Sequence, residues 1–469
     1  MPLPDLIEIV PLAAPVRAEI TVPGSKSITN RALILAALAD GEVTLKGALW
    51  SEDTEIMFDC LQKLGFEVSK QNDPDEPCNR TITVKGLGGK IPNAGTAEKP
   101  LELFVGNAGT AARFLAAFVC LGQGVYRLSG VPRMHERPQA ALFSALRELG
   151  YRVESENGND KLPARISHRA TENTEKIKSY SGTSVPLWQK KCKVSIEESS
   201  QFASALLLSS KIGGWEIEIV GENADESPYV AMTSKLMEAF PKNGGTFQIE
   251  PDASSGSYFW GAGFLGPEKI LPPEPIKFGP LAGIIAETKH VSNVSVGVWP
   301  TSGWQIDQNF LKGFLYKTII SREADLGDSI MTAIALAPVR GMTIQFTHLG
   351  RLRVQECERV VALRTELTKC GAKVIEEGDT LTVYPSKLEE LHGAEIETYN
   401  DHRMAMCFAI LGLKVPGIKI KNPACVKKTF PNFFQKLAAQ PPHGLGAEIW
   451  EIKDGQRTRK LSGEDLFAE

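Results

Sequence analysis

A unit built on one plan recurs six times along the chain, and this repeat restricts the possible folds more than any other feature of the sequence. Each unit opens with a turn of small or polar residues, continues as an apolar run of helical length, and usually ends at a glycine. The six units begin at Pro23, Gly106, Glu198, Pro251, Asp325 and Asn400. A repeat of this kind predicts a fold assembled from similar supersecondary units.

Strand-like runs follow several of these helical runs. EVTLKGAL from Glu42, WEIEIVG from Trp215 and MTIQFTHL from Met342 are rich in β-branched residues and alternate in polarity, which favours β-strands. A second amphipathic helix often comes next and ends at a glycine, as in LFSALRELGYRV. The opening helices are apolar nearly all round (LILAALA, FLAAFVC), which is typical of buried helices. The sequence therefore predicts an α/β fold in which buried helices alternate with strands.

Six units of this size exceed a single compact core, so we expect two domains of three units each. We place the first domain at 21–250 and the second at 1–20 together with 251–439. A proline-dense stretch predicts an insert in the fourth unit near 267–293. Residues 440–469 break the pattern and are expected to form a C-terminal tail.

Composition argues against several classes of protein. The 469 residues carry a formal net charge of −4, whereas nucleic-acid and acidic-membrane binders usually lean basic. The first residues lack the features of a signal peptide, and no run reaches the roughly 18 apolar residues of a membrane helix. None of the eight cysteines falls in a CxxC pair or beside a histidine at metal-ligand spacing. We therefore expect a cytoplasmic protein with reduced, buried thiols and no structural metal.

Candidate functional residues gather at the turns that open the helical runs. Lys26, Ser27 and Arg31 lie in PGSKSITNR between a strand-like run and a helix, where free N–H groups and the helix dipole favour an anion. An ordinary capped turn is an equally good interpretation of this motif alone. Asn107 and Gly109 lie in GNAGT, which either lets the backbone approach a ligand closely or forms a plain tight turn.

Further candidates have an everyday explanation when each is taken alone. Arg137 ends the basic loop PRMHER, which resembles a solvated charge run, and Ser199, Ser200 and Gln201 could simply cap a helix. Glu356 and Arg359 have the spacing of a surface ion pair. The remaining candidates are Asp328, Arg351, Gln355, His402, Arg403 and Lys428.

Taken together, these residues indicate more than each does alone. Arginine and lysine recur at the same place in several units of a chain that is slightly acidic overall. This pattern predicts a cationic pocket for small polyanions, assembled between two domains. Asp328 and Glu356 would be carboxylates among cations, suited to proton transfer. The residues by themselves indicate an enzyme or a binder of phosphorylated metabolites.

The same motifs resemble the 5-enolpyruvylshikimate-3-phosphate synthases, also called 3-phosphoshikimate 1-carboxyvinyltransferases. The resemblance runs from about Pro11 to Leu437 and rests on PGSKSITNRALILAALADG, GNAGTA-x-R, PRMHERP, SSQF, DASS-x-SYF and NDHRMAM. It implies two domains, each of three βαβαββ units around buried parallel helices, with the active site in the cleft between them. It also implies transfer of the enolpyruvyl group of phosphoenolpyruvate to the 5-hydroxyl of shikimate 3-phosphate, without a metal or an organic cofactor, by a monomer.

The resemblance carries roles to matching positions. Lys26, Asp328 and Glu356 would be catalytic: Lys26 contacts both substrates, Asp328 takes the 5-hydroxyl proton, and Glu356 delivers one to the enolpyruvyl methylene. Shikimate 3-phosphate would be held by Lys26, Ser27, Arg31, Ser199, Ser200, Gln201, Asp328 and Gln355. Phosphoenolpyruvate would be held by Lys26, Asn107, Gly109, Arg137, Gln201, Arg359, His402, Arg403 and Lys428.

This sequence departs from the family pattern at several positions. In R-x-K-E-x-D-R the usual lysine is Gln355, which removes a positive charge beside the substrate, and Arg351 is a candidate to replace it. The serine usual three residues before the tyrosine of the PY motif is Glu226, with Ser227 one position late. These departures motivate one alternative, a degraded paralogue that binds a phosphorylated metabolite without turnover. A second alternative is an enolpyruvyl transferase acting on UDP-N-acetylglucosamine, although Lys-Ser at 26–27 and the lack of a cysteine in PRMHERP disfavour it.

Overall fold

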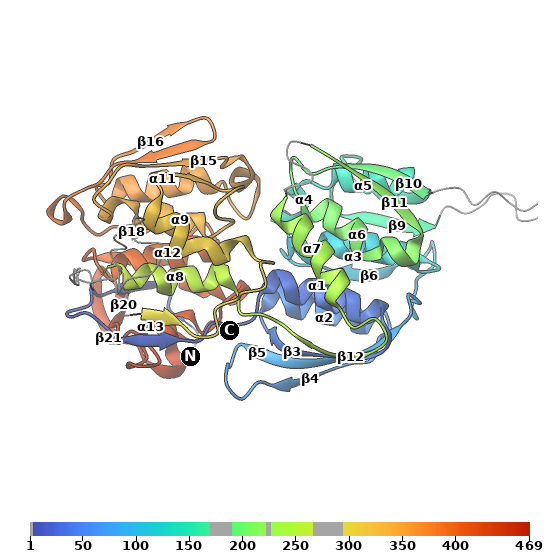
Figure 1. Cartoon of the computed structure of the whole chain (residues 1–469), viewed down its shortest axis with the longest axis horizontal. Helices are drawn as coiled ribbons and strands as arrows, with labels where there is room; N and C mark the ends of the chain where they lie inside the picture. The colour runs from blue at the N-terminus through green and yellow to red at the C-terminus, as the bar shows by residue number, and fades with distance from the viewer. Residues whose placement is uncertain (1–2, 169–189, 222–226, 266–293) are drawn as a thin grey trace, which may run out of the picture.

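Two lobes lie side by side in the computed structural model, and each encloses its own hydrophobic core (Figure 1). The structure describes residues 3–168, 190–221, 227–265 and 294–469. The lobe formed by the middle of the chain, called the inner lobe, has a core that runs from Ile28 to Ile249. The lobe formed by the flanking parts of the chain, called the outer lobe, has a core that combines Leu3–Val22 with Tyr258–Ala468. The inner lobe is thus inserted into the chain of the outer lobe. The domain limits given above stay a prediction, and the predicted insert near 267–293 lies outside the described residues.

Three buried helices form the centre of each lobe, and within a lobe each of them contacts the other two. Those of the inner lobe are α1 (Lys26–Leu38), α3 (Gly109–Phe118) and α6 (Gln201–Gly213), and those of the outer lobe are α8 (Ala253–Gly263), α10 (Ile330–Leu336) and α12 (His402–Gly412). All six correspond to the apolar runs that open the repeated units. The remaining helices are α2 (Glu52–Lys63), α4 (Pro132–Glu136), α5 (Ala140–Glu148), α7 (Pro228–Ala239), α9 (Phe310–Tyr316), α11 (Arg359–Lys369) and α13 (Phe433–Ala438).

Three four-stranded sheets repeat one topology, in which a parallel pair is extended by an antiparallel hairpin. The first has the order β12 (Gly245–Gln248), β3 (Asp40–Leu49), β5 (Asn79–Leu87), β4 (Val68–Asn72). The second has the order β6 (Leu101–Phe104), β7 (Val125–Ser129), β9 (Ala164–His168), β8 (Tyr151–Ser155). The third, in the outer lobe, has the order β14 (Ile319–Ser321), β15 (Ile344–Thr347), β17 (Thr380–Val383), β16 (Val374–Glu377).

Two further sheets are parallel pairs of strands: β10 (Lys190–Ser195) with β11 (Trp215–Val220), and β2 (Ala18–Ile20) with β13 (Val294–Val296). The recurrence of one strand order in both lobes confirms the predicted α/β fold of related units around buried helices. It also explains why the sequence repeats, because every unit must cover the same kind of apolar helix.

Residues from the two ends of the chain share the last sheet. Its order is β18 (Glu395–Ile396), β19 (Ile418–Lys421), β1 (Leu6–Ile9), β20 (Ile449–Lys453), β21 (Gln456–Lys460). The segment expected to be a tail, 440–469, therefore supplies two strands, and its Leu445, Ile449 and Leu466 belong to the outer core.

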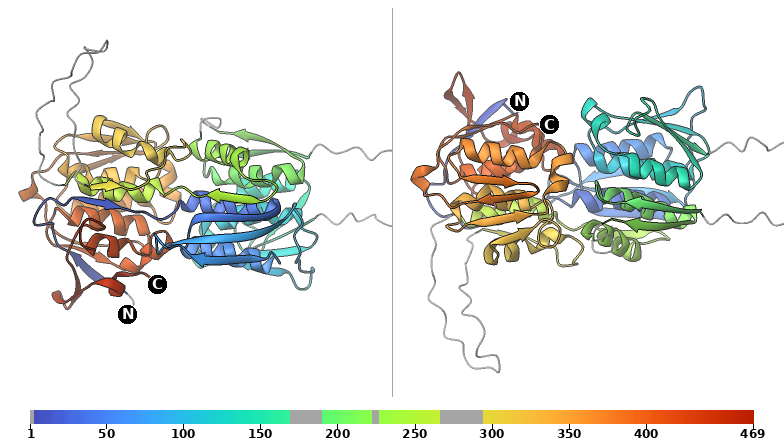
Figure 2. Two further views of the ribbon diagram at one scale, coloured as in Figure 1. Left: turned by 60° about the horizontal axis from the view of Figure 1, so that its bottom comes forward. Right: turned by 90° about the horizontal axis from the view of Figure 1, so that it is seen from above.

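The chain passes between the lobes twice, and the two passages lie side by side (Figure 2). The Ser25 N–H donates to the Glu250 carbonyl at 2.8 Å, and the Asp252 N–H donates to the Pro23 carbonyl at 2.9 Å. Both passages lead directly into buried helices, α1 in the inner lobe and α8 in the outer lobe. The first turns of helices from different lobes are thereby brought to the same place.

Candidate active site

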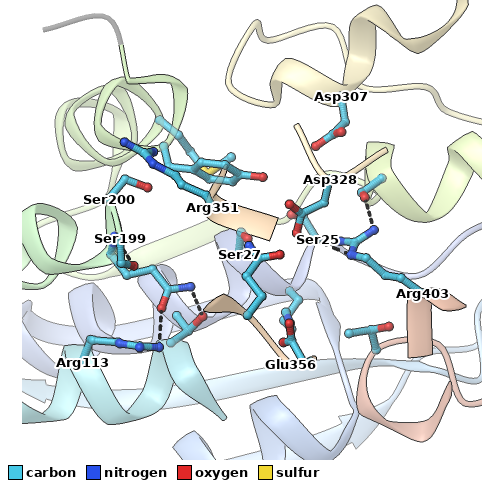
Figure 3. A pocket seen from close by; sticks show the side chains of 18 of the residues that line it. Ser25, Ser27, Arg113, Ser199, Ser200, Asp307, Asp328, Arg351, Glu356 and Arg403 are labelled. Carbon is cyan, nitrogen blue, oxygen red and sulfur yellow. Dashed lines mark hydrogen bonds and ion pairs between the residues drawn. The ribbon is translucent and has the colours of Figure 1, made fainter. Parts of the chain in front are cut away.

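A cavity of about 110 Å³ lies between the lobes (Figure 3), and its lining includes residues in or just before the first turn of each of the six buried helices. The lining residues at or next to these first turns are Lys26, Thr110, Gln201, Ser254, Asp328 and Arg403. A helix N-terminus carries the positive end of the helix dipole and free backbone N–H groups. Six such ends around one small cavity favour a negatively charged ligand.

The lack of side-chain caps on several of these helices strengthens the preference for a negatively charged ligand. Within the described residues, the N-terminal residues Ser25, Ala108, Ser200 and Ser329 make no side-chain capping hydrogen bond to α1, α3, α6 or α10. The side chains of Asp252 and Asp401 cap α8 and α12, and the Gln201 N–H at the start of α6 donates to Ser199 Oγ at 3.2 Å. Uncapped N–H groups at a cavity are donors that a ligand oxygen can use.

Two arginines of the inner lobe are buried without a carboxylate partner within the described part of the chain. Arg31 donates to the Thr233 and Ser204 hydroxyls at 2.8 and 3.1 Å, and burial lowers its pKa to about 10. Arg113 donates to the Gln201 amide oxygen at 3.1 Å, and burial followed by the charge of Arg137 lowers its pKa well below the usual value. Burying an unpaired charge is costly, so a ligand that brings negative charge would be stabilised here.

The carboxylate of Asp328 faces these groups from the outer lobe. Arg322 Nη2 lies 2.7 Å from its Oδ1, while Arg403 Nε and Arg359 Nη1 lie 3.4 and 3.7 Å from its Oδ2. Burial alone would raise the pKa of Asp328, but these three cations outweigh it and hold the pKa well below its usual value. Asp328 is therefore ionised and can accept a proton from a substrate.

Glu356 is the second carboxylate of the cavity. Its Oε1 lies 3.1 Å from Lys428 Nζ, and its Oε2 lies 2.8 Å from Arg359 Nη2. Burial would raise the pKa of Glu356, yet Lys428, Arg359 and Arg137 hold it well below the usual value. In turn, Arg359 is anchored by the fully buried Asp401, with 2.7 Å between Nε and Oδ2. Glu356 is thus ion-paired with Arg359 and Lys428, two cations to which an incoming anion could bind in its place.

The predicted residues fall into two groups around the cavity. Those that line it are Lys26, Ser27, Arg31, Arg137, Ser199, Ser200, Gln201, Asp328, Gln355, Glu356 and Arg403. Asn107, Gly109, Arg359, His402 and Lys428 are not part of its described lining and lie behind it. Lys26 is held by Asp53, with 3.0 Å between Nζ and Oδ2. His402 is almost fully buried, and burial followed by the charge of Lys26 lowers its pKa well below the usual value, so its ring is neutral.

The layer behind the cavity joins the two lobes. The Asn107 carbonyl of the inner lobe accepts hydrogen bonds from Arg137 at 3.1 Å and from Lys428 of the outer lobe at 3.3 Å. Arg133 donates across the cleft to the Gln355 and Glu356 carbonyls at 3.2 and 3.3 Å. These contacts position residues of both lobes around one cavity, as an interdomain site requires.

The departures from the family pattern have structural counterparts. The Gln355 amide oxygen accepts a hydrogen bond from Arg359, so the side chain stays at the cavity but brings no charge. Arg351 also lines the cavity, where its Nη2 donates to the Ile196 carbonyl of the other lobe at 2.9 Å. Ser227 is the buried residue that precedes α7, and Glu226 lies outside the described residues.

Sequence reasoning missed four charged groups of the site. They are Asp53, Asp307, Arg322 and Asp401. Asp401 is inside the quoted motif NDHRMAM and could have been found from it, because it precedes His402 at the start of a helical run. Nothing near Asp53, Asp307 or Arg322 in the sequence marks it as different from a surface residue.

Two solved structures share this architecture and define the class of fold. The chain superposes on an EPSP synthase from Acinetobacter baumannii with a TM-score of 0.60 and 19% identity, covering 95% of this chain and 100% of that one. It superposes on the enolpyruvyl transferase NikO from Streptomyces tendae with a TM-score of 0.58 and 13% identity, covering 96% and 99%. The fold is therefore that of the enolpyruvyl transferases.

Sequence comparison places the chain within that class. The family model described as EPSP synthase (3-phosphoshikimate 1-carboxyvinyltransferase) matches residues 11–243 and 241–437. Curated 3-phosphoshikimate 1-carboxyvinyltransferases from Trichormus variabilis and Opitutus terrae are each 35% identical, covering 92% and 93% of this chain and 98% of each relative. The chain belongs to the EPSP synthase family, which confirms the resemblance inferred from its motifs.

Two further findings concern the described residues alone. None of the helices there is long and apolar enough to cross a membrane. All eight cysteines are free and buried, as the sequence predicted.

Proposed function

We propose that this chain transfers the enolpyruvyl group of phosphoenolpyruvate to the 5-hydroxyl of shikimate 3-phosphate and releases phosphate. One observation carries the proposal: among the described residues, buried arginines without carboxylate partners, and helix N-termini whose N-cap residues make no side-chain cap, surround two ionised carboxylates in one interlobe cavity. Two anionic substrates would supply the missing negative charge, and the carboxylates would move protons between them.

Shikimate 3-phosphate would bind mainly to the inner lobe. Arg31 and the serines before α6 offer donors to its phosphate and carboxylate, while Gln201 is already oriented by hydrogen bonds to Arg113 and Thr110. Asp328 would reach the ring hydroxyls from the other side. We assign this substrate to Lys26, Ser27, Arg31, Ser199, Ser200, Gln201, Asp328 and Gln355.

Phosphoenolpyruvate would bind where Glu356 meets its cations. A phosphate or carboxylate oxygen could replace the Glu356 carboxylate on Arg359 and Lys428, because a charge-assisted hydrogen bond to an anion is equally available to either partner. We assign this substrate to Lys26, Asn107, Gly109, Arg137, Gln201, Arg359, His402, Arg403 and Lys428. His402 and Gly109 would shape the pocket from behind, since they do not line it.

The same exchange prepares Glu356 for proton transfer. Its cations keep the carboxylate ionised in the structure, so it must gain a proton before it can deliver one. A bound anion that takes up the charge of Lys428 and Arg359 would raise the pKa of Glu356 and favour that protonation. Binding of the substrate would therefore switch this residue from a base to an acid.

The chemistry then proceeds by addition and elimination. Asp328 takes the proton of the 5-hydroxyl as its oxygen bonds to the second carbon of phosphoenolpyruvate, and Glu356 protonates the methylene carbon to give a methyl group. In the second step Glu356 removes a methyl proton, the carbon–oxygen bond to phosphate breaks, and the proton held by Asp328 leaves with phosphate. Lys26, paired with Asp53, would stabilise the charge on both substrates.

Phosphate release from phosphoenolpyruvate tests the proposal directly. We expect release that depends on shikimate 3-phosphate, while UDP-N-acetylglucosamine as acceptor gives none. Release with the nucleotide sugar alone would assign the chain to the other transferase. We further expect a cytoplasmic monomer that needs neither a metal nor an organic cofactor, which gel filtration and activity after chelation would examine.

A second candidate function is a binding protein without turnover, and the uncharged Gln355 is the observation that favours it. Calorimetric binding of both substrates alongside the phosphate assay separates the two. Binding at micromolar concentration with no phosphate released from folded protein would establish the binding protein, and Gln355→Lys would then be the variant to assay.

A further inference from the structure

Arg322 is the closest cation to Asp328, and this is its only side-chain partner within the described residues. It follows β14 and lies at the cavity wall with 5% of its surface exposed. Its Nη2 donates to Asp328 Oδ1 at 2.7 Å, and its buried Nε has no hydrogen-bond partner in the described part of the chain. A guanidinium carries five N–H donors, so most of this one stays available.

The other two cations near Asp328 are shared with other groups. Arg359 is bound to Asp401 and Glu356, and Arg403 donates to the Ser254 and Tyr258 hydroxyls at 2.5 and 3.3 Å. Both approach Asp328 Oδ2 at distances longer than a good hydrogen bond, 3.7 Å for Arg359 and 3.4 Å for Arg403. Oδ1 is thus fixed by Arg322, while Oδ2 keeps room to accept a proton from a substrate hydroxyl.

A positive charge is also missing nearby. Gln355 contributes an uncharged amide that is occupied by Arg359, whereas Arg322 and Arg351 both line the cavity. Arg351 feels the charge of Arg322, which after burial is the second cause that lowers the pKa of Arg351. Two guanidinium groups that repel each other across a cavity are relieved by an anion bound between them.

We propose that Arg322 is a positioning residue of the transfer reaction: its ion pair fixes Oδ1 of Asp328 so that Oδ2 meets the acceptor hydroxyl, and its charge takes the place of the cation absent at Gln355. This inference rests on the proposed function and adds to it a residue outside every motif quoted above. A matched pair of readouts, kcat and the pH profile, distinguishes positioning from a purely structural role.

The pH profile follows from the groups that face Asp328. They are Arg322 after β14, Arg359 on α11, Arg403 on α12, Asp307 in the short helix Ile306–Asn309, and Tyr229 on α7. Burial raises the pKa of Asp328 and the three arginines lower it. Without the charge of Arg322 only Arg359 and Arg403 lower it, so the pKa of Asp328 rises toward its usual value or beyond it. At a given acidic pH a larger fraction of Asp328 is then protonated, and the acidic limb of the kcat profile moves to higher pH.

Arg322→Gln and Arg322→Lys, each alone and with Gln355→Lys, form the test. We expect Arg322→Gln to lower kcat by about 100-fold, the size of a general-base contribution, and to move the acidic limb upward. Arg322→Lys should recover part of kcat and return the limb toward that of the wild type. Gln355→Lys should raise kcat in the Arg322→Gln background. Arg127→Gln is the control, because Arg127 on β7 is likewise an ion-paired arginine, with Glu102 and Glu156 as partners, but lies outside the cavity lining.

The outcomes separate this inference from the proposed function. A wild-type chain without turnover overturns both. A wild-type chain that turns over, with Arg322→Gln retaining kcat and the same acidic limb, overturns the role of Arg322 alone. Equal losses in Arg322→Gln and Arg322→Lys, with a lowered unfolding temperature and an unmoved acidic limb, would also refute it, since they show a structural ion pair.

Discussion

Gly109 lies against two arginines of the site, and this predicts how Gly109→Ala should behave. A Cβ atom at position 109 would stand 2.4 Å from Arg113 Nη1 and 2.7 Å from Arg137 Nη2. Ordinary contacts between such atoms need about 3.5 Å, so both guanidinium groups must move by about 1 Å. Both are the ends of flexible side chains, and alanine suits a helix better than glycine does. The fold should therefore lose no stability.

The cost should appear in binding instead. Arg137 is assigned to phosphoenolpyruvate, and a displacement of about 1 Å would break one charge-assisted hydrogen bond, which is worth about 1.5–3 kcal/mol. That energy corresponds to a rise of about 10- to 150-fold in KM for phosphoenolpyruvate, where KM reports binding. The KM for shikimate 3-phosphate should rise less, because the displaced Arg113 reaches that substrate only through its hydrogen bond to Gln201, whereas Arg137 is assigned to phosphoenolpyruvate itself.

Initial rates of phosphate release, measured against each substrate in turn, give both KM values, and thermal unfolding of the same samples reports stability. The KM for shikimate 3-phosphate serves as the internal control. An unchanged KM for phosphoenolpyruvate would refute the reasoning, as would an equal rise in both KM values. A lower unfolding temperature would show that the clash is relieved through the backbone rather than through the arginines.

Three other outcomes are expected. Asp401→Asn should lower the free energy of unfolding in urea by about 3–5 kcal/mol, because it leaves the buried Arg359 without its anchor, and an unshifted urea midpoint would contradict this. Lys26→Ala and Glu356→Gln should nearly abolish phosphate release while circular dichroism stays that of the wild type, whereas Lys63→Ala, an exposed lysine on α2, should keep the full rate. The eight thiols, whose pKa values burial raises, should react with Ellman's reagent only after unfolding, and rapid reaction of any thiol in the folded protein would show an exposed cysteine.

Residues that line the cavity could be predicted from the sequence where they start helices, while their roles in binding and catalysis stay a prediction. Lys26, Gln201 and Arg403 each lie in the first turn of an apolar helical run, and the first turns of buried helices meet at the cleft in both lobes. A pattern of small residues before an apolar run is visible locally, so these positions could be found without any knowledge of the packing.

Other parts depend on contacts that leave no local trace. Arg322 is ion-paired with Asp328 because the turn between β14 and α10 brings the two side chains together. The residues from 323 to 327 form no periodic pattern that would predict this contact. The strands in 440–469 are short, and β20 pairs with β1 at the other end of the chain while β21 pairs with β20. Their role in the outer core could therefore not be inferred from their own composition.

The position of β1 has a consequence for how the protein is made. β1 is translated before the inner lobe, yet it pairs with β19 and β20, which are translated after that lobe, with Ile7 opposite Ile420 and Glu451. The inner lobe, by contrast, has its whole core between Ile28 and Ile249 and can fold while the rest is still being translated. The nascent outer lobe must therefore keep β1 unpaired until β19 has been translated, and a chain that stalls before residue 418 would expose that strand to aggregation or to chaperones.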